Sequence, residues 1–325
     1  MTDWHIFRGS GTPHDWVTPP APPWRNFATA ASLRLAENLW WERNPIDLER
    51  ARTYQPEPKE LEALNVALFL RRPLLITGPP GTGKSTLPYS VAYELGLGSV
   101  LRWPINSRST LQEGLYRYDA VGRLQDSNLS GVGDRHSPAG IGQYIRLGPL
   151  GTALLPFDRP RVLLIDEIDK SDVDLPNDLL NVLEEGEFQI PELIRGGERG
   201  EHVFIHGQDE PVPLPGGTVR CSTFPVVVLT SNGERDFSPA FLRRCVRLEL
   251  SVPGPDRLAR IVESHLGPEY RSRSADLIAH FLSQRDSAQL STDQLLNAVF
   301  LTMNVEVADR RQLIDSVLRS LSSTV

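Results

Sequence analysis

Short apolar segments alternate with segments of helical spacing through the middle of the chain. Two of the helical segments, PKELEALNVALFL (58–70) and KSTLPYSVAYELG (84–96), carry apolar residues at the spacing of one helix face, and Gly96 closes the second. The apolar segments have the length of buried strands: PLLIT (73–77), SVLRWPI (99–105), RVLLID (161–166), FPVVVLTS (224–231) and VRLEL (246–250). Apolar strands that alternate with helices are typical of parallel sheets covered on both faces. The pattern predicts an α/β domain with a five-stranded parallel sheet over residues 55–250.

The two ends of the chain differ from this middle part. Residues 1–54 contain the proline-rich TPPAPPW, so we expect an extended arm there, with a short helix near ASLRLAENLWWER. The arm holds most of the tryptophans: Trp4, Trp16, Trp24, Trp40 and Trp41. They either pin the arm to its own domain or form a docking surface for a partner or a neighbouring subunit. Residues 251–325 repeat apolar residues at helical spacing and predict a small all-helical C-terminal domain.

Two insertions interrupt the predicted α/β domain. Residues 106–150 include the glycine-rich SGVGDRHSPAGIGQ, and we expect irregular structure there. Residues 187–223 contain short strand-like segments separated by RGGERGE and LPGGT, which predicts one or two β-hairpins. Long insertions in a compact fold are usually functional or mobile.

A phosphate-binding sequence follows the first predicted strand and opens a helix. GPPGTGKST matches the P-loop pattern G-x-x-x-x-G-K-[ST] in that setting. Backbone N–H groups of such a loop bind phosphate, Lys84 would reach the β- and γ-phosphates, and Ser85 would bind Mg²⁺ through its hydroxyl. The predicted nucleotide-binding residues are Gly78, Pro79, Pro80, Gly81, Thr82, Gly83, Lys84, Ser85 and Thr86.

Adjacent carboxylates end the third predicted strand, in LLIDEIDKSDVDLP. Like charges side by side need a compensating cation, and the Mg²⁺ that accompanies ATP would supply it. We expect Asp166 to hold the magnesium and Glu167 to polarise the attacking water. Strand alternation would point the two side chains apart. The alternative is an acidic turn at the end of a strand.

Polar residues at two later positions fit the same chemistry. Asn232 follows the strand VVVLTS and could orient the attacking water. Arg243 and Arg244 precede the last strand, and an arginine can stabilise charge on a transferring phosphate. Their geometry towards the chain's own P-loop is poor, so we expect them, Arg244 in particular, to act on ATP bound by a neighbouring subunit. The alternative is a surface basic patch or an ion pair with Glu249.

The order of these motifs resembles an AAA+ ATPase over about residues 55–320, with the C-terminal helices as its lid domain. YIRLGPLGTALL before LLIDEIDKSDVDLPNDLLNVLEEGEFQI is similar to the MoxR branch. The resemblance implies ATP bound at the interfaces of a ring, usually a hexamer, and remodelling of a partner protein. It also implies a possible partner with a von Willebrand factor A domain, and the arm resembles MoxR-type ATPases of bacterial conflict systems.

One expected residue is missing from this resemblance. Many AAA+ lids carry an arginine that touches the γ-phosphate, but the matching position here reads Ser291, Thr292 and Asp293. An acid cannot take that role. Either Arg285 or Arg310 replaces the arginine, or the contact is absent.

Composition narrows the choice of function. The net charge is −7, from 41 acidic and 34 basic residues, which argues against nucleic-acid binding. The two cysteines have no metal-type spacing, no apolar run is long enough for a membrane span, and the N-terminus has no signal-peptide pattern, so we expect a cytoplasmic protein without a membrane partner. Arg102 and Arg108 could face nucleotide or a pore, although surface ion pairs are the simpler interpretation.

Three functions fit these motifs. The first is an ATP-driven remodeller, in which the neighbour's Arg244 completes each site. The second is a nucleotide-gated switch or scaffold with slow or no turnover, and the complete set of catalytic residues argues against it. The third is a nucleic-acid-associated NTPase motor, which the acidic charge disfavours. The P-loop reads phosphates, so the preference for ATP over GTP rests on the resemblance.

Overall fold

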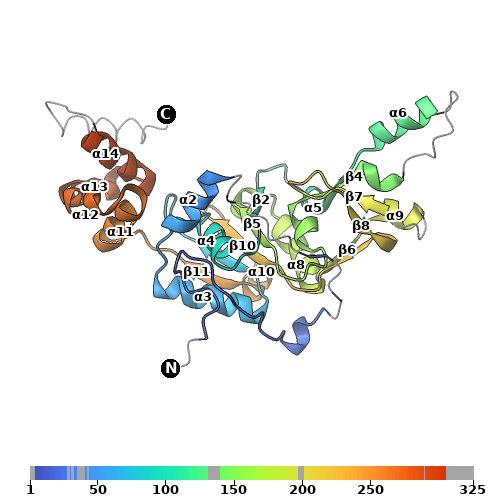
Figure 1. Ribbon diagram of the computed structural model, residues 1–325, viewed down its shortest axis with the longest axis horizontal. Coiled ribbons are helices and arrows are strands. Elements are labelled where there is room, and N and C mark those ends of the chain that lie inside the picture. The colour runs from blue at the N-terminus through green and yellow to red at the C-terminus, as the bar shows by residue number, and fades with distance from the viewer. Residues whose placement is uncertain are drawn as a thin grey trace.

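A five-stranded parallel sheet forms the centre of the chain (Figure 1). The computed structural model describes residues 4–27, 30, 33–34, 41, 44–130, 140–196, 201–288 and 290–304. The strands are β1 (Leu74–Thr77), β2 (Leu101–Pro104), β5 (Val162–Asp166), β10 (Val226–Ser231) and β11 (Val246–Glu249). Their order across the sheet is β11-β1-β10-β5-β2, and every neighbouring pair is parallel. The predicted α/β fold is confirmed, and each strand lies within its predicted segment.

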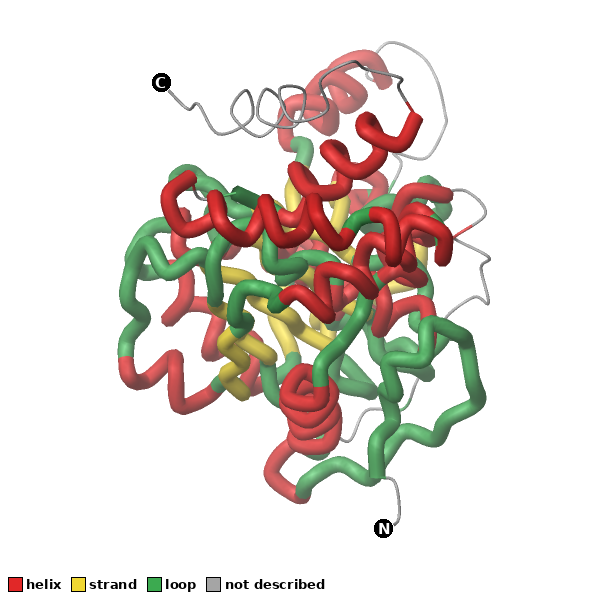
Figure 2. The backbone as a smooth tube through the Cα atoms, turned by 90° about the vertical axis from the view of Figure 1, so that its left-hand side faces the viewer, coloured by secondary structure: helices red, strands yellow, loops and turns green. Residues whose placement is uncertain are grey.

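Alternation along the strands sends apolar side chains to two separate cores. Leu75, Leu163 and Ile165 pack on one face, and Leu74 and Leu164 pack on the other. The first face is covered by α5 (Leu111–Leu115), α7 (Pro149–Ala153), α8 (Leu175–Glu185) and α10 (Pro239–Arg244). The second face is covered by α2 (Pro45–Thr53), α3 (Pro58–Leu70) and α4 (Leu87–Glu94). Figure 2 shows the strands enclosed by helices. Burial on both faces explains why the inner strands β1, β5 and β10 are almost entirely apolar, whereas the edge strands β2 and β11 carry exposed charged residues such as Arg102 and Arg247.

The two helices next to the P-loop, α3 and α4, each have a proline in their first turn. Helix α3 begins at Pro58, with the reciprocal capping box between Glu57 and Glu60. Helix α4 begins at Leu87, so the predicted start at Lys84 was wrong. Pro88 is the reason, because proline has no N–H to donate and fits only the first turn of a helix. Gly96, in the left-handed region, follows α4 as expected.

The first insertion is more regular than expected. Strands β3 (Tyr116–Tyr118) and β4 (Ile145–Leu147) form an antiparallel pair flanked by α5 and α7. Between them lie α6 (Ala120–Ser130), which projects away from the sheet in Figure 1, and the 3₁₀ turn η2 (Ile141–Tyr144). The prediction of irregular structure was wrong because strands of three residues and helices of five are too short to show a period. Most of the glycine-rich stretch lies outside the described residues.

The second insertion forms two antiparallel strand pairs, as predicted. Strand β6 (Glu187–Gln189) pairs with β9 (Thr218–Arg220), and β7 (Glu201–Val203) pairs with β8 (Val212–Leu214). The short helix α9 (Pro191–Gly196) and the 3₁₀ turn η4 (Pro215–Gly217) connect them.

Within residues 251–304, as far as the structure describes them, four helices follow the sheet: α11 (Pro255–Leu266), α12 (Pro268–Arg273), α13 (Ala275–Ala288) and α14 (Thr292–Asn304). They enclose a core of their own that includes Val262, Phe281 and Val299. The last predicted helix, DRRQLIDSVLRSLSS, lies outside the described residues. Within the described part of the chain, no helix has the length and apolar character that crossing a membrane requires.

A buried ion pair joins these helices to the α/β domain. Arg257 of α11 makes two hydrogen bonds to the carboxylate of Glu60 in α3, at 2.7 and 3.1 Å, and Glu60 is fully buried. The hydroxyl of Tyr54 donates to the same carboxylate at 2.7 Å. The Tyr54 ring also lies against the P-loop, 3.4 Å from where a Cβ on Gly83 would stand. The orientation of α11 is therefore tied to the nucleotide-binding loop.

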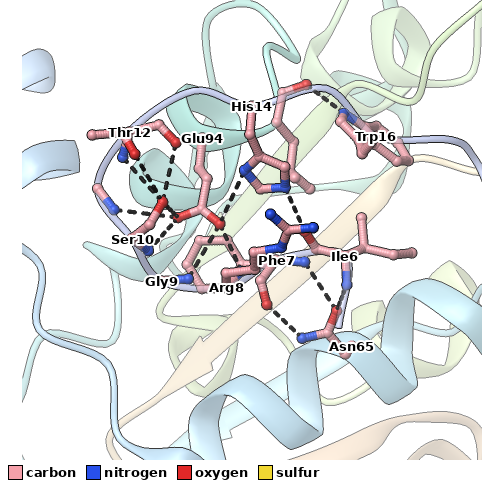
Figure 3. A network of polar contacts seen from close by, with 12 residues as sticks. Ile6, Phe7, Arg8, Gly9, Ser10, Thr12, His14, Trp16, Asn65 and Glu94 are labelled. Atoms are coloured by element: carbon pink, nitrogen blue, oxygen red, sulfur yellow. Dashed lines mark hydrogen bonds and ion pairs between the residues drawn. The ribbon is translucent and has the colours of Figure 1, made fainter. Parts of the chain in front are cut away.

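The N-terminal arm is held by the buried carboxylate of Glu94, at the end of α4 (Figure 3). Four backbone N–H groups, those of Arg8, Gly9, Ser10 and Gly11, donate to it over 2.6–3.3 Å. Next to this cradle, Phe7 is fully buried in the core beside α3. Such a nest of N–H groups is a favourable environment for an anion.

Trp16 and Trp41 of the arm contact the α/β domain. Trp16 donates to the carbonyl of Leu95 at 2.8 Å, and Trp41 packs edge-on against Tyr93. For these two, pinning to the chain's own domain is confirmed, whereas Trp24 remains 75% exposed. The short helix expected near ASLRLAENLWWER lies almost entirely outside the described residues.

We expect Glu94→Gln to lower the free energy of unfolding by about 2–3 kcal/mol, because it removes the charge that several N–H groups share. Urea unfolding measures the change, and hydrogen exchange should show lost protection at residues 8–11. The control is Glu263→Gln, which removes one partly exposed ion pair with Arg271. Equal stability of the two variants would contradict the role given to Glu94.

Candidate functional site

The candidate residues meet at one edge of the sheet. The P-loop follows β1, Asp166 ends β5, and Asn232 follows β10. Because all three strands are parallel and β10 lies between the other two, their carboxyl ends form a single crevice. Ligands of open α/β sheets bind in crevices of this kind.

The path of the P-loop requires glycine at defined positions. Gly78 has φ +147°, and a Cβ there would stand 2.4 Å from the carbonyl oxygen of Leu250. Gly81 has φ +72°, and a Cβ there would stand 2.5 Å from the Cβ of Ser291 at the start of α14. The lid segment that begins at Ser291 therefore does lie against the loop, but the arginine that was expected two residues further on is replaced by Asp293.

Lys84 lies folded over the loop. Its Nζ donates to the carbonyls of Gly78 at 2.7 Å and Pro79 at 2.8 Å, and the side chain is mostly buried. Burial lowers the pKa of Lys84, against the opposing effect of Asp169, Glu167 and Asp166. Lys84 is therefore a buried cation close to three carboxylates, two of which also form ion pairs with Arg102 and Lys170.

Asp166 is the centre of the polar contacts. Its Oδ1 accepts from the hydroxyls of Ser85 at 2.6 Å and Thr230 at 2.8 Å, and its Oδ2 accepts from Arg102 at 2.9 Å. Burial alone would raise the pKa of Asp166, but these three hydrogen bonds and the Arg102 charge outweigh it and lower the pKa. The carboxylate and hydroxyl oxygens are hard ligands of the type that Mg²⁺ prefers, so the residues fit the predicted metal.

Glu167 lies in a turn directly after β5, not in the strand as expected. The strand ends at Asp166, and Glu167 has φ +63°, in the left-handed region. Alternation along the strand is therefore not what separates the two carboxylates; the turn at Glu167 does. Its N–H donates to the hydroxyl of Thr230 at 2.9 Å, and its partly exposed carboxylate pairs with Lys170 at 2.9 Å. A positive φ at a glutamate is uncommon and is typically found at functional sites.

Asp169 was not predicted as part of the site, and it supports Asn232. Its Oδ2 accepts the backbone N–H groups of Asn232 at 2.9 Å and Glu234 at 3.1 Å, which fixes the loop after β10. Its Oδ1 is buried and has no hydrogen-bond partner among the described residues. The sequence signal was available, because Asp169 lies three residues after Asp166 in LLIDEID.

Arg243 and Arg244 lie away from the chain's own P-loop. They end α10, and the next strand begins with Val246, whose N–H donates to Pro73 just before β1. The P-loop follows the opposite end of β1, so the strand separates the arginines from it. Arg244 pairs with Glu184 of α8, not with Glu249, and Arg243 donates to the carbonyl of Pro239 at 3.2 Å.

Arg102, on the edge strand β2, contacts the candidate site. It was interpreted as a surface ion pair, and it does form one, but its partner is the proposed magnesium ligand Asp166. The sequence could not give this pairing, because it follows from β2 lying beside β5 in the sheet. The predicted lid alternatives are not placed by the structure: Arg310 lies outside the described residues, and the side chain of Arg285 is not described.

Comparison with known proteins agrees with the α/β fold. Residues 73–245 match the family model for the AAA domain of the dynein-related subfamily. Because the match covers more than half of the chain, the chain belongs to this AAA domain family, whose members bind nucleotide at a P-loop. No curated protein matches the chain.

Two solved structures are similar in part. NtrX from Brucella abortus, in complex with ADP, is 14% identical with a TM-score of 0.37 and aligns with 82% of this chain and 57% of its own. A candidate ATPase from Cytophaga hutchinsonii is 11% identical with a TM-score of 0.36 and aligns with 83% of this chain and 66% of its own. The chain therefore spans less than two thirds of either protein.

Proposed function

We propose that this chain is a MoxR-like AAA+ ATPase that hydrolyses ATP at the interfaces of a homo-oligomeric ring and remodels a partner protein. The observation that carries the proposal is the cluster of Ser85, Asp166 and Thr230 beside the P-loop lysine. Oxygen ligands, a phosphate-binding loop and an adjacent glutamate in one crevice are the parts that phosphoryl transfer to water requires.

Each residue has a defined task in this proposal. Backbone N–H groups of residues 81–86 and the ammonium of Lys84 bind the phosphates. Ser85 and Asp166 hold Mg²⁺, which neutralises charge on the phosphates when it is bound. Glu167 accepts the proton of the attacking water, and Asn232 orients that water. The hydrogen bond from Thr230 to Asp166 orients this carboxylate towards Ser85.

The arginines complete the site of a second subunit. Arg243 and Arg244 lie near the start of β1, whereas the P-loop follows the end of this strand. We therefore propose that they contact ATP bound by a neighbouring copy of the chain. A head-to-tail contact of this kind generates a ring when its rotation closes, and a closed hexamer is our proposal for the assembly. A protein with a von Willebrand factor A domain is the partner that we propose for the ring.

One observation favours a second candidate, a nucleotide-gated switch with slow turnover. Lys170 pairs with Glu167, Arg102 pairs with Asp166, and Glu184 pairs with Arg244. The charges of Asp166, Glu167 and Arg244 are therefore engaged within the single subunit, and these ion pairs must open before the three residues can act in hydrolysis.

Hydrolysis measured per subunit across a wide range of protein concentration tests the proposal. We expect specific activity to rise with concentration as rings form, and Arg244→Ala to be inactive at every concentration while it still binds ATP. Arg247→Ala is the control, because Arg247 is an exposed arginine on β11 a few residues further along. Nucleotide binding with negligible hydrolysis at all concentrations would favour the switch.

A further inference from the structure

An arginine-rich cavity of about 460 Å³ lies beside the nucleotide site, where β2 meets the first insertion. Four arginines line it: Arg102, Arg108, Arg117 and Arg146. Glu113 is the one acidic residue among its lining residues. Composition does not explain this concentration of positive charge, because the whole chain carries a net charge of −7.

The fold places two of these arginines directly opposite each other. Arg117 of β3 and Arg146 of β4 are paired across the antiparallel strands, so their side chains share one face. Like charges in opposed positions destabilise a sheet. An uncharged polar residue at either position would avoid the repulsion, and an anion between the two charges would remove it.

The chain itself supplies little negative charge to the cavity. Arg146 donates to the carbonyls of Ile205 at 3.3 Å and Gln208 at 3.2 Å, which fix its position without neutralising it. Arg117 has a single long contact with Glu113, 3.8 Å between exposed side chains. Among the described residues, the guanidinium of Arg108 forms no hydrogen bond or ion pair.

His206, which also lines the cavity, is affected by the positive charge of nearby arginines. The pKa of His206 is lowered, first by burial and then by the charges of Arg161, Arg146 and Arg117. The imidazole therefore remains neutral near pH 7 and adds no further positive charge. Arg102 pairs with Asp166, whereas Arg108 and Arg146 have no carboxylate partner among the described residues and are available to an anion from outside.

We propose that this cavity binds aspartate or glutamate side chains of a protein segment, and that Arg102 connects their binding to the magnesium site. Trp103, Leu147 and Pro149 form apolar walls between the arginines, which suits a peptide with carboxylates on short aliphatic stems. A nucleic acid would instead extend past the cavity over an acidic molecule, where its phosphates are repelled.

Arg102 belongs to the cavity and to the catalytic site at once. Its guanidinium pairs with Asp166, while its side chain, 53% exposed, lines the cavity. A carboxylate in the cavity competes with Asp166 for Arg102 and so frees Asp166 to hold Mg²⁺. This coupling rests on the proposed function, whereas binding of the acidic segment does not.

Fluorescence anisotropy with a labelled oligoglutamate tests binding to the full chain without nucleotide. We expect saturable binding that weakens with salt, and about tenfold weaker binding for Arg108→Ala/Arg117→Ala. Arg271→Ala, at an exposed ion pair on α12, is the matched control and should bind as the wild type does. An oligoglutamine and an oligodeoxythymidine of the same length are the comparison probes.

The outcomes separate the cavity from the ATPase proposal. Equal binding of oligoglutamine, stronger binding of the oligonucleotide, or no binding of any probe would overturn the cavity proposal. Oligoglutamate should also lower the magnesium concentration needed for half-maximal binding of a fluorescent ATP analogue in the wild type but not in Arg102→Ala. An unchanged magnesium requirement in the wild type would overturn the coupling. Failure of the analogue to bind at all would overturn the proposed function and the coupling, while oligoglutamate binding would still stand.

Discussion

Replacing Glu167 by glutamine is expected to slow ATP hydrolysis by about 10²–10³-fold while leaving ATP binding nearly unchanged. The amide keeps the size of the side chain and can still accept a hydrogen bond, but it cannot take a proton from water. The backbone turn that carries residue 167 is held by the Thr230 hydroxyl through the main-chain N–H, which the substitution leaves in place.

The measurement pairs steady-state hydrolysis with binding of a fluorescent ATP analogue. Glu234→Gln is the control, since Glu234 lies in the neighbouring loop and contacts Asp169 only through its backbone N–H. A Glu167→Gln variant that hydrolyses ATP at the wild-type rate would remove Glu167 from the mechanism. Equal losses in both variants would indicate a general effect of charge near the site.

Replacing Arg257 by alanine is expected to lower the free energy of unfolding by about 3–5 kcal/mol. The cost arises because Glu60 is fully buried and would keep only the hydroxyl of Tyr54 as a side-chain partner. Loss of the pair should also loosen helices α11 to α14 from α3 and weaken nucleotide binding, because Tyr54 lies against the P-loop.

Urea unfolding and hydrogen exchange in α11 measure these two effects. Arg260→Ala, one turn further along α11, is the matched control and should change stability by less than about 1 kcal/mol. Adding Glu60→Gln to Arg257→Ala should restore part of the loss, because it removes the unpaired buried charge. Equal behaviour of Arg257→Ala and Arg260→Ala would contradict the buried ion pair.

Local sequence patterns could predict the parts of the site that are contiguous in the chain. The P-loop is recognisable from the spacing of its residues, and Asp166 and Glu167 are recognisable because they directly follow an apolar strand. The five strands could be predicted because each is a short apolar segment. The start of α4 could also have been placed correctly, because Pro88 excludes an earlier helical turn in which its N–H would be needed.

Contacts that depend on the order of the strands across the sheet could not be predicted from local sequence patterns. Thr230 reaches Asp166 because β10 lies beside β5, and Arg102 reaches it because β2 lies on the other side. Neither neighbour follows from the order of the segments in the chain. The opposition of Arg117 and Arg146 likewise depends on the register of two strands of three residues each, too short to predict by pattern.

The ion pairs of the catalytic residues give the single subunit a resting arrangement. Asp166 holds Arg102, Glu167 holds Lys170, and Arg244 holds Glu184. The last two pairs are well exposed, so they cost little to break when ATP and a neighbouring subunit compete for their charges. Such an arrangement would limit hydrolysis until the ring assembles.

Mixing two inactive variants tests the shared site most directly. Glu167→Gln lacks the base but keeps the arginine for its neighbour, and Arg244→Ala lacks the arginine but keeps its own base. If each site is built by two subunits, an equal mixture that exchanges subunits should regain roughly a quarter of the wild-type hydrolysis rate, because one neighbouring pair in four joins intact halves. A mixture as inactive as its components, under conditions in which subunit exchange is demonstrated, would contradict a site completed by Arg244 of a neighbouring subunit.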